Sequence, residues 1–189
     1  GDILQPSTLE KAFEHIDAVI HAAATTSMWP SRSENTRRII VEGTKNIVEA
    51  ALRQSIQRLI FVGTANSFSP GSKDTPGREG SPYICGKYRM DYMDSKYQAH
   101  RFVETAAIGN ALTMGKIGES YILGNENLSY GEFFQRAAKV LGVKAPRLKM
   151  PRPLVLATGL FGSAASLLTG KPPLLSYAMA RVGCDGHYY

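Results

Sequence analysis

The sequence of 189 residues is poor in cysteine, with only Cys85 and Cys184, and it has a single tryptophan, Trp29. Two cysteines cannot build the disulfide framework of a small secreted domain, so that class is excluded. The chain opens without the positive charge and apolar run of a signal peptide, and we therefore expect a cytoplasmic protein. Hydrophobic residues make up 43% and charged residues 20%, which excludes a wholly disordered chain.

Charge of one sign is not concentrated anywhere in the chain. The 22 basic and 16 acidic residues give a net charge of +6, but Arg37 and Arg38 are the only adjacent basic pair. Aromatic residues do not interleave with the basic ones, so we expect no nucleic-acid partner. Residues 153–170 carry no charge, but glycine, serine and threonine dilute this run. It therefore predicts a buried or pocket-lining helix and no membrane span.

What is present is an alternation of apolar runs and amphipathic segments. Residues 17–24 and 58–62 are short apolar runs typical of strands buried on both faces. Residues 34–52 repeat apolar positions at steps of three and four, and residues 92–107 also favour a helix. This order predicts an α/β fold with a parallel sheet. Because two strands cannot make such a sheet, we expect further strands that this sequence lacks.

The second part of the chain has a different pattern. Residues 118–123 could form a strand. Ser129 followed by Glu132 has capping-box spacing, and Gly142 follows Leu141 as a stop signal. We therefore expect a helix that ends near Leu141.

The strongest chemical signal is the spacing of Tyr92 and Lys96. Four residues apart on a helix places both side chains on one face, one turn apart. A lysine ammonium stabilises a phenolate beside it, which lowers the pKa of a tyrosine from about 10 toward working pH and makes it a usable acid or base. Tyr83 and Lys87 have the same spacing, but Gly86 and a loop setting make them the poorer helical pair. On spacing alone, either pair could be an ordinary surface pair.

Thr64 is a further candidate, because it follows the apolar run that ends at Val62. The carboxyl ends of parallel strands are where α/β proteins bind ligands. A hydroxyl at this place could bind the substrate oxygen that Tyr92 protonates. The alternative is a threonine that only satisfies backbone groups at the strand end.

Five segments follow one another in a recognisable order: Gly1–Ile3, Asp17–Ala24, Val41–Asn46, Phe61–Ala65 and Tyr92–Lys96. Together they resemble the extended short-chain dehydrogenase/reductase family, the NAD-dependent epimerase/dehydratase group, and most nearly its dihydroflavonol-reductase-like branch. Residues 118–124 and 127–133 resemble the C-terminal substrate region of that family. The resemblance implies a Rossmann-type doubly wound parallel sheet. Residues 1–107 would be a partial dinucleotide-binding domain and residues 108–189 a partial C-terminal substrate-binding region.

Two elements of that family are not found in the sequence. The glycine-rich turn Gly-x-Gly-x-x-Gly, which seats a pyrophosphate, does not occur. The resemblance therefore implies that the first strands are missing. It also implies a gap near residues 107–109, where another strand should follow the catalytic helix.

The resemblance assigns roles to single residues. Tyr92 would be the general acid/base, Lys96 would stabilise its phenolate and hold the nicotinamide ribose, and Thr64 would orient the substrate oxygen. Further cofactor contacts are implied for a short set of residues, namely Asp2 and Ile3 at the adenine and Ala22, Ala23 and Ala24 where the cofactor approaches the backbone. The cofactor would be NAD or NADP, and no metal ligand is expected.

The implied activity is hydride transfer between a nicotinamide and a carbonyl or alcohol of a small-molecule substrate, with tyrosine as general acid/base. A sugar-nucleotide epimerase or dehydratase of the same family is an alternative, as is a non-catalytic nucleotide-binding protein on the same fold. The resemblance also implies a possible homodimer through the helices near residues 34–52 and 92–107. No membrane partner is expected.

Overall fold

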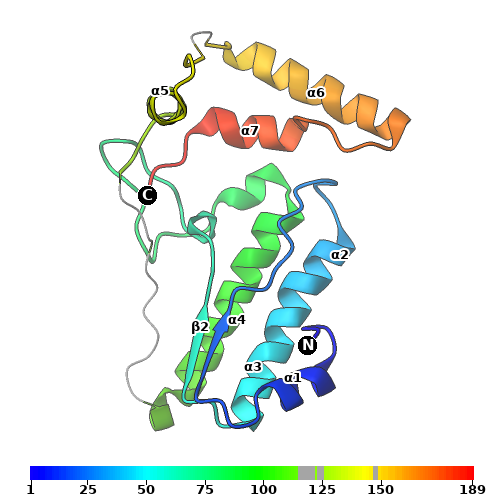
Figure 1. The fold of residues 1–189 in the computed structure, drawn as a ribbon, viewed down its shortest axis with the longest axis vertical. Helices are drawn as coiled ribbons and strands as arrows, with labels where there is room; N and C mark the ends of the chain where they lie inside the picture. The colour runs from blue at the N-terminus through cyan, green and yellow to red at the C-terminus, as the bar shows by residue number, and fades with distance from the viewer. Residues whose placement is uncertain (115–121, 123–125, 147–148) are drawn as a thin grey trace. The chain divides into compact units, whose positions relative to one another are not determined.

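A two-stranded parallel sheet organises the first part of the chain in the computed structural model. Strand β1 (Ala18–His21) pairs with β2 (Arg58–Phe61), with Ala18 opposite Arg58 and His21 opposite Phe61. Figure 1 shows the two strands beside helices α3 and α4. The expected α/β fold with a parallel sheet is confirmed.

The chain divides into two compact units. Unit 1 comprises Gly1–Ser67 and Tyr83–Tyr121, and unit 2 comprises Phe68–Pro82 and Ile122–Tyr189. The domain division expected at residue 107 stays a prediction. The structure describes residues 1–114, 122, 126–146 and 149–189.

The connection between the two strands is one long helix with an irregular turn inside it. Helix α2 (Glu34–Arg37) begins after Ser33, whose hydroxyl accepts a hydrogen bond from the Thr36 amide at 3.2 Å. It continues through a π-helical turn, η1 (Arg38–Glu42), into α3 (Gly43–Arg53). The predicted helix over residues 34–52 is confirmed, but its π turn was not expected. Such turns are frequent at functional sites.

Helices cover one face of this small sheet. Helix α1 (Pro6–Ala12) begins at a proline, whose fixed φ suits the first helical position. The core of this face joins α1, α3 and the inward residues of both strands; its buried members are Leu9, Phe13, Ile47, Ala50, Ala51 and Ile56, with Ile3, Val19 and Leu59 packed against them.

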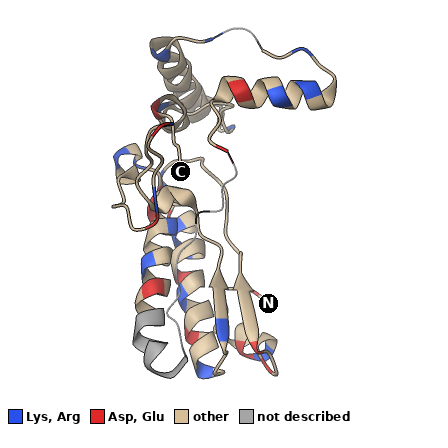
Figure 2. Ribbon diagram, turned by 90° about the vertical axis from the view of Figure 1, so that its left-hand side faces the viewer, with Lys and Arg blue, Asp and Glu red and all other residues tan. Residues whose placement is uncertain are grey.

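The other face of the sheet is open. Ile20 is 69% exposed and Ile60 is 47% exposed. The prediction that both strands are buried on both faces is therefore wrong for this face, because the helices of unit 1 cover only the side that carries Val19 and Leu59. Figure 2 shows charged residues along the helices of unit 1, whereas Arg58 is the one charged residue of the two strands.

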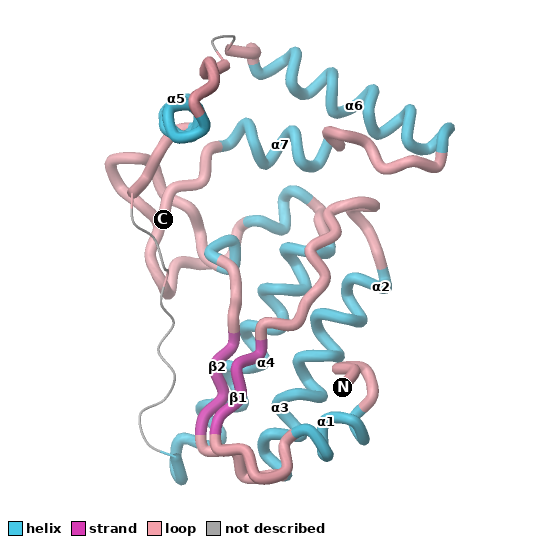
Figure 3. The backbone as a smooth tube through the Cα atoms, in the orientation of Figure 1, coloured by secondary structure: helices cyan, strands magenta, loops and turns pink. Residues whose placement is uncertain are grey.

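Helix α4 carries the predicted Tyr–Lys pair. Two short 3-10 turns, η2 (Ala65–Ser67) and η3 (Cys85–Tyr88), lie between β2 and this helix (Figure 3). Helix α4 spans Asp91–Met114 without interruption. The helix runs through residues 107–109, and no strand follows the Tyr–Lys pair there. The expected gap, a strand of the family that is missing from this sequence, stays a prediction.

Unit 2 contains three helices in its described part. Helix α5 (Tyr130–Leu141) has the expected capping box at Ser129 and ends at Gly142 in a left-handed conformation, so that prediction is confirmed. Helix α6 (Arg152–Thr169) is followed by α7 (Tyr177–Asp185). The expected strand over residues 118–123 lies outside the described residues, apart from Ile122, which is not in a strand.

The uncharged segment forms α6, but it is not buried. Phe161 is 74% exposed and Leu168 is 89% exposed, so of the two alternatives, a buried or a pocket-lining helix, the buried one is wrong and the pocket-lining one stays a prediction. Gly159 and Gly162 permit the close approach of α7 and of the segment before it: a Cβ on Gly159 would lie 2.7 Å from the Cβ of Ala180 in α7, and one on Gly162 would lie 2.5 Å from the carbonyl oxygen of Leu175. Within the described part of the chain, no helix has the length and hydropathy needed to cross a membrane.

Candidate functional site

Lys96 is a buried amine at the carboxyl end of β2. The residue is 5% exposed, and its Nζ donates a hydrogen bond to the carbonyl oxygen of Val62 at 2.8 Å. The same Nζ lies 4.9 Å from the ring centroid of Phe61. Burial lowers the pKa of Lys96. The amine is thus held where ligands bind in parallel α/β sheets.

Tyr92 lies one helical turn before Lys96 on α4, so both side chains project from the same side of the helix. Tyr92 is partly buried, and its hydroxyl has no hydrogen-bond partner among the described residues. Helix α4 also contacts η2, the turn that begins directly after Thr64. The Oγ1 of Thr64 accepts a hydrogen bond from the Asn66 amide at 3.4 Å. The hydroxyl proton of Thr64 is therefore left for another acceptor.

His21 lies at the end of β1, opposite Phe61 at the end of β2, and the sequence analysis did not identify it as a site residue. It is 3% exposed at the end of β1, and its Nε2 shares a hydrogen bond with the Oγ1 of Thr44 at 2.9 Å. Within the described residues, its Nδ1 is buried without a partner. Burial, with a smaller contribution from the charge of Lys96, lowers the pKa of His21 to about 4. The available signal was a histidine inside an otherwise apolar run.

The lowered pKa of His21 predicts an acid-sensitive fold. His21 is neutral in the folded chain, whereas in the unfolded chain it binds a proton below its ordinary pKa of 6.5. Stability should therefore fall as the pH drops from 6.5 toward 4, by about 3 kcal/mol in total. Urea unfolding at a series of pH values measures this loss. His21→Gln should flatten the curve in this window, and an unchanged slope would contradict the assignment.

The segment after β1 is open and lined by small side chains. Ala22 and Ala23 are exposed, and Ala24 is half-buried.

At the N-terminus, the Asp2 carboxylate accepts hydrogen bonds from the Leu4 amide at 2.9 Å and from the Gln5 side chain at 3.2 Å. A hollow of about 490 Å³ opens here, and its walls carry charges of both signs; it is lined by Asp2, Leu4, Gln5, Arg38, Glu42, Lys45, Asn46 and Glu49.

Ile3 has a structural role in this structure. Its side chain lies against Gly43, where an added Cβ would meet the Ile3 Cδ1 at 2.5 Å. Its carbonyl oxygen accepts a hydrogen bond from the Asn46 side chain at 2.9 Å. The N-terminal segment is thereby fixed on α3, and the side chain of Ile3 packs against the core.

Tyr83, the tyrosine of the second Tyr–Lys pair in the sequence, is engaged in contacts with other residues. Its hydroxyl donates a hydrogen bond to Asp94 at 2.6 Å, and its ring stacks on Tyr97 at 4.2 Å between centroids. Burial, followed by the contact with Asp94, raises the pKa of Tyr83 far above its ordinary value. Tyr83 also precedes the 3-10 turn that carries Lys87, so the two do not share a helix. Among the described residues, no cluster of histidine, cysteine or acidic residues could hold a metal ion.

The family of the chain follows from comparison with known proteins. The family model described as "3-beta hydroxysteroid dehydrogenase/isomerase family" matches residues 1–145. The chain belongs to this family. Its resemblance to the extended short-chain dehydrogenases/reductases is thereby confirmed.

Two curated proteins illustrate the range of this 3-beta hydroxysteroid dehydrogenase/isomerase family. A Mycobacterium tuberculosis protein named "3 beta-hydroxysteroid dehydrogenase/Delta 5-->4-isomerase" is 25% identical over 190 residues, which cover 94% of this chain and 51% of that protein. A Bos taurus protein named "Short-chain dehydrogenase/reductase family 42E member 1" is 33% identical over 123 residues, which cover 61% of this chain and 30% of that protein. The chain thus spans about half the length of the Mycobacterium tuberculosis protein.

Solved structures show the fold. The crystal structure of gox2253 superposes on the whole chain with a TM-score of 0.70 at 22% identity, and the match covers 74% of that chain. The UDP-glucose 4-epimerase of Thermus thermophilus, solved in complex with NAD, matches 61% of this chain and 36% of its own, with a TM-score of 0.50 at 19% identity. The expected Rossmann-type architecture is confirmed by these matches.

Proposed function

We propose that this protein is an NAD(P)-dependent oxidoreductase that transfers hydride between a nicotinamide and the carbonyl or alcohol carbon of a small molecule. The observation that carries the proposal is the buried amine of Lys96, fixed at the end of β2 one helical turn from Tyr92. Such an amine is expensive to bury. Acid–base chemistry with the unbonded hydroxyl of Tyr92, one helical turn away, would account for an amine buried at this position.

The residues after β1 fit a dinucleotide. The exposed small side chains of Ala22 and Ala23 leave the backbone accessible to a ligand, which a larger side chain would obstruct. Lys96 presents an ammonium at the same edge of the sheet and would hold a ribose hydroxyl. The turn around Asp2 would hold the adenine end, because each carboxylate oxygen can accept a second hydrogen bond. When bound, the nicotinamide supplies or accepts the hydride.

Three side chains would take part in proton transfer to and from the substrate oxygen. Tyr92 would give a proton to the substrate oxygen during reduction and take it back during oxidation. Lys96 would stabilise the phenolate that forms in the first case. Thr64 would donate a hydrogen bond to the same oxygen and orient it, since its Oγ1 already accepts one from the Asn66 amide.

A panel assay tests the proposal. NAD+ and NADP+ are offered with a 3β-hydroxysteroid, and NADH and NADPH with aldehydes and ketones, while absorbance at 340 nm reports turnover. UDP-glucose is offered in a separate arm, with epimerisation as its readout. We expect turnover in a redox arm. Epimerisation without redox turnover would favour the sugar-nucleotide alternative, and binding of NAD+ without any turnover would favour the non-catalytic one.

The choice between NAD and NADP is left to the same panel. A homodimer through α2, α3 and α4 and a cytoplasmic location stay predictions.

A further inference from the structure

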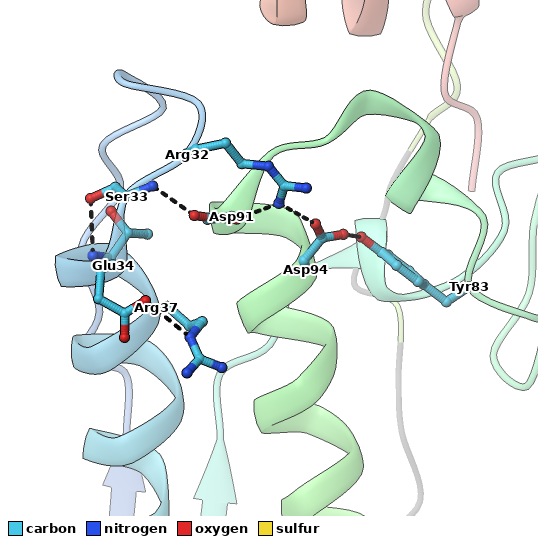
Figure 4. A network of polar contacts seen from close by, with 8 residues as sticks. Arg32, Ser33, Glu34, Arg37, Tyr83, Asp91 and Asp94 are labelled. Carbon is cyan, nitrogen blue, oxygen red and sulfur yellow. Dashed lines mark hydrogen bonds and ion pairs between the residues drawn. The ribbon is translucent and has the colours of Figure 1, made fainter.

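A network of charged and polar groups surrounds the first turn of α4. Arg32 Nη1 lies 2.5 Å from Asp91 Oδ1 and 3.3 Å from Asp94 Oδ2. Both carboxylates are mostly buried, with side chains 17% and 24% exposed, whereas the Arg32 side chain is 56% exposed. Figure 4 shows the guanidinium between the two acids and the Tyr83 hydroxyl on the far side of Asp94.

The network also fixes the backbone. The Ser33 amide donates a hydrogen bond to Asp91 Oδ2 at 2.6 Å, and the Asp91 amide donates one to the carbonyl oxygen of Ser31 at 2.8 Å. Residues 31–33 end the loop that leaves β1 through Ala22–Ala24. The start of α4 is therefore joined to the segment that the proposed function assigns to the cofactor.

Tyr92 lies between the two acids in the sequence, on the turn that this network holds. Two carboxylates three residues apart in one helical turn repel each other. One nitrogen of Arg32 contacts both and offsets this repulsion. Because the Arg32 side chain is 56% exposed, its two ion pairs contribute little to global stability, and their effect is mainly to fix the position of this turn.

We propose that Arg32 is a positioning residue for Tyr92: it holds Asp91 and Asp94, and through them the first turn of α4, against the loop that leaves the cofactor end of β1. The proposal rests on the proposed function and adds to it a residue outside the Tyr–Lys–Thr set. Tyr83 supports the same arrangement, because its hydroxyl donates a hydrogen bond to Asp94 Oδ1 while Arg32 contacts Asp94 Oδ2.

Arg32→Ala tests the proposal. We expect kcat for the redox reaction to fall by about 10- to 100-fold with KM nearly unchanged, because a small misplacement of the proton donor is costly. Arg32→Lys should restore most of kcat, since a single Nη1 makes both contacts in the native structure and one ammonium can replace it. Arg37→Ala is the matched control. The Arg37 side chain is 53% exposed and, among the described residues, forms an ion pair only with the exposed Glu34 (Figure 4).

A second readout needs neither substrate nor cofactor. Amide hydrogen exchange at Ser33 and Asp91 should speed up in Arg32→Ala and stay unchanged in Arg37→Ala. Faster exchange with an unchanged kcat would overturn the positioning role, and so would equal losses of kcat in the two variants. A parent protein that turns over no substrate would contradict the proposed function, while the exchange data would still report whether Arg32 holds the turn.

Discussion

Tyr92→Phe is expected to lower the rate of hydride transfer by about 10²- to 10⁴-fold, the range that a general acid–base group contributes. The substitution keeps the ring and removes only the hydroxyl, which has no partner among the described residues. Folding should therefore be unaffected, with the free energy of unfolding within about 0.5 kcal/mol of the parent. Steady-state kinetics at 340 nm and urea unfolding measure the two effects.

Tyr83→Phe is the comparison that makes this result specific. It removes the hydrogen bond to Asp94 but leaves the ring stacked on Tyr97. We expect a loss of rate of no more than about tenfold and a loss of stability of about 0.5–1.5 kcal/mol. The reverse order, with Tyr83→Phe inactive and Tyr92→Phe active, would transfer the proton role to Tyr83.

Local patterns predicted most elements of the fold. The apolar steps from Ile40 to Ala51 indicated the long helix, and Ser129 with Glu132 indicated the start of α5, since capping depends on neighbours in the chain. The exposed faces were not predictable in this way. Whether Ile20 or Phe161 is covered depends on what packs against it, and hydropathy alone carries no such information.

In the candidate site, too, the sequence predicted local pairs of residues and missed contacts between distant segments. Tyr92 and Lys96 were found because both lie on one helix, where spacing determines the face. Arg32 was missed because its partner Asp91 is 59 residues away in the sequence. The contact between His21 and Thr44 spans 23 residues and was missed for the same reason. Pairing across elements requires the register of β1 and β2 and the packing of α3 and α4.

Lys96→Met is expected to separate activity from stability. In the proposed mechanism, the substitution removes the ammonium that would stabilise the Tyr92 phenolate, because a nearby positive charge favours the negatively charged form. We therefore expect the rate at pH 7 to fall by about 10- to 1000-fold. Stability should change by less than about 1 kcal/mol or rise, because an apolar side chain of similar length removes the cost of burying the amine. The carbonyl of Val62 loses its donor, and this loss offsets part of the gain.

Lys87→Met is the matched control for this substitution. Lys87 is the lysine of the competing Tyr–Lys spacing, and its Nζ lies 4.8 Å from the ring centroid of Tyr88, as the Nζ of Lys96 lies 4.9 Å from Phe61. Both variants thus lose an amine above an aromatic ring, but only Lys96 reaches the end of β2. Lys87→Met should keep the parent rate within about twofold. A Lys96→Met protein that unfolds more readily and still turns over at the parent rate would make the buried amine a structural group, with the proton chemistry placed elsewhere.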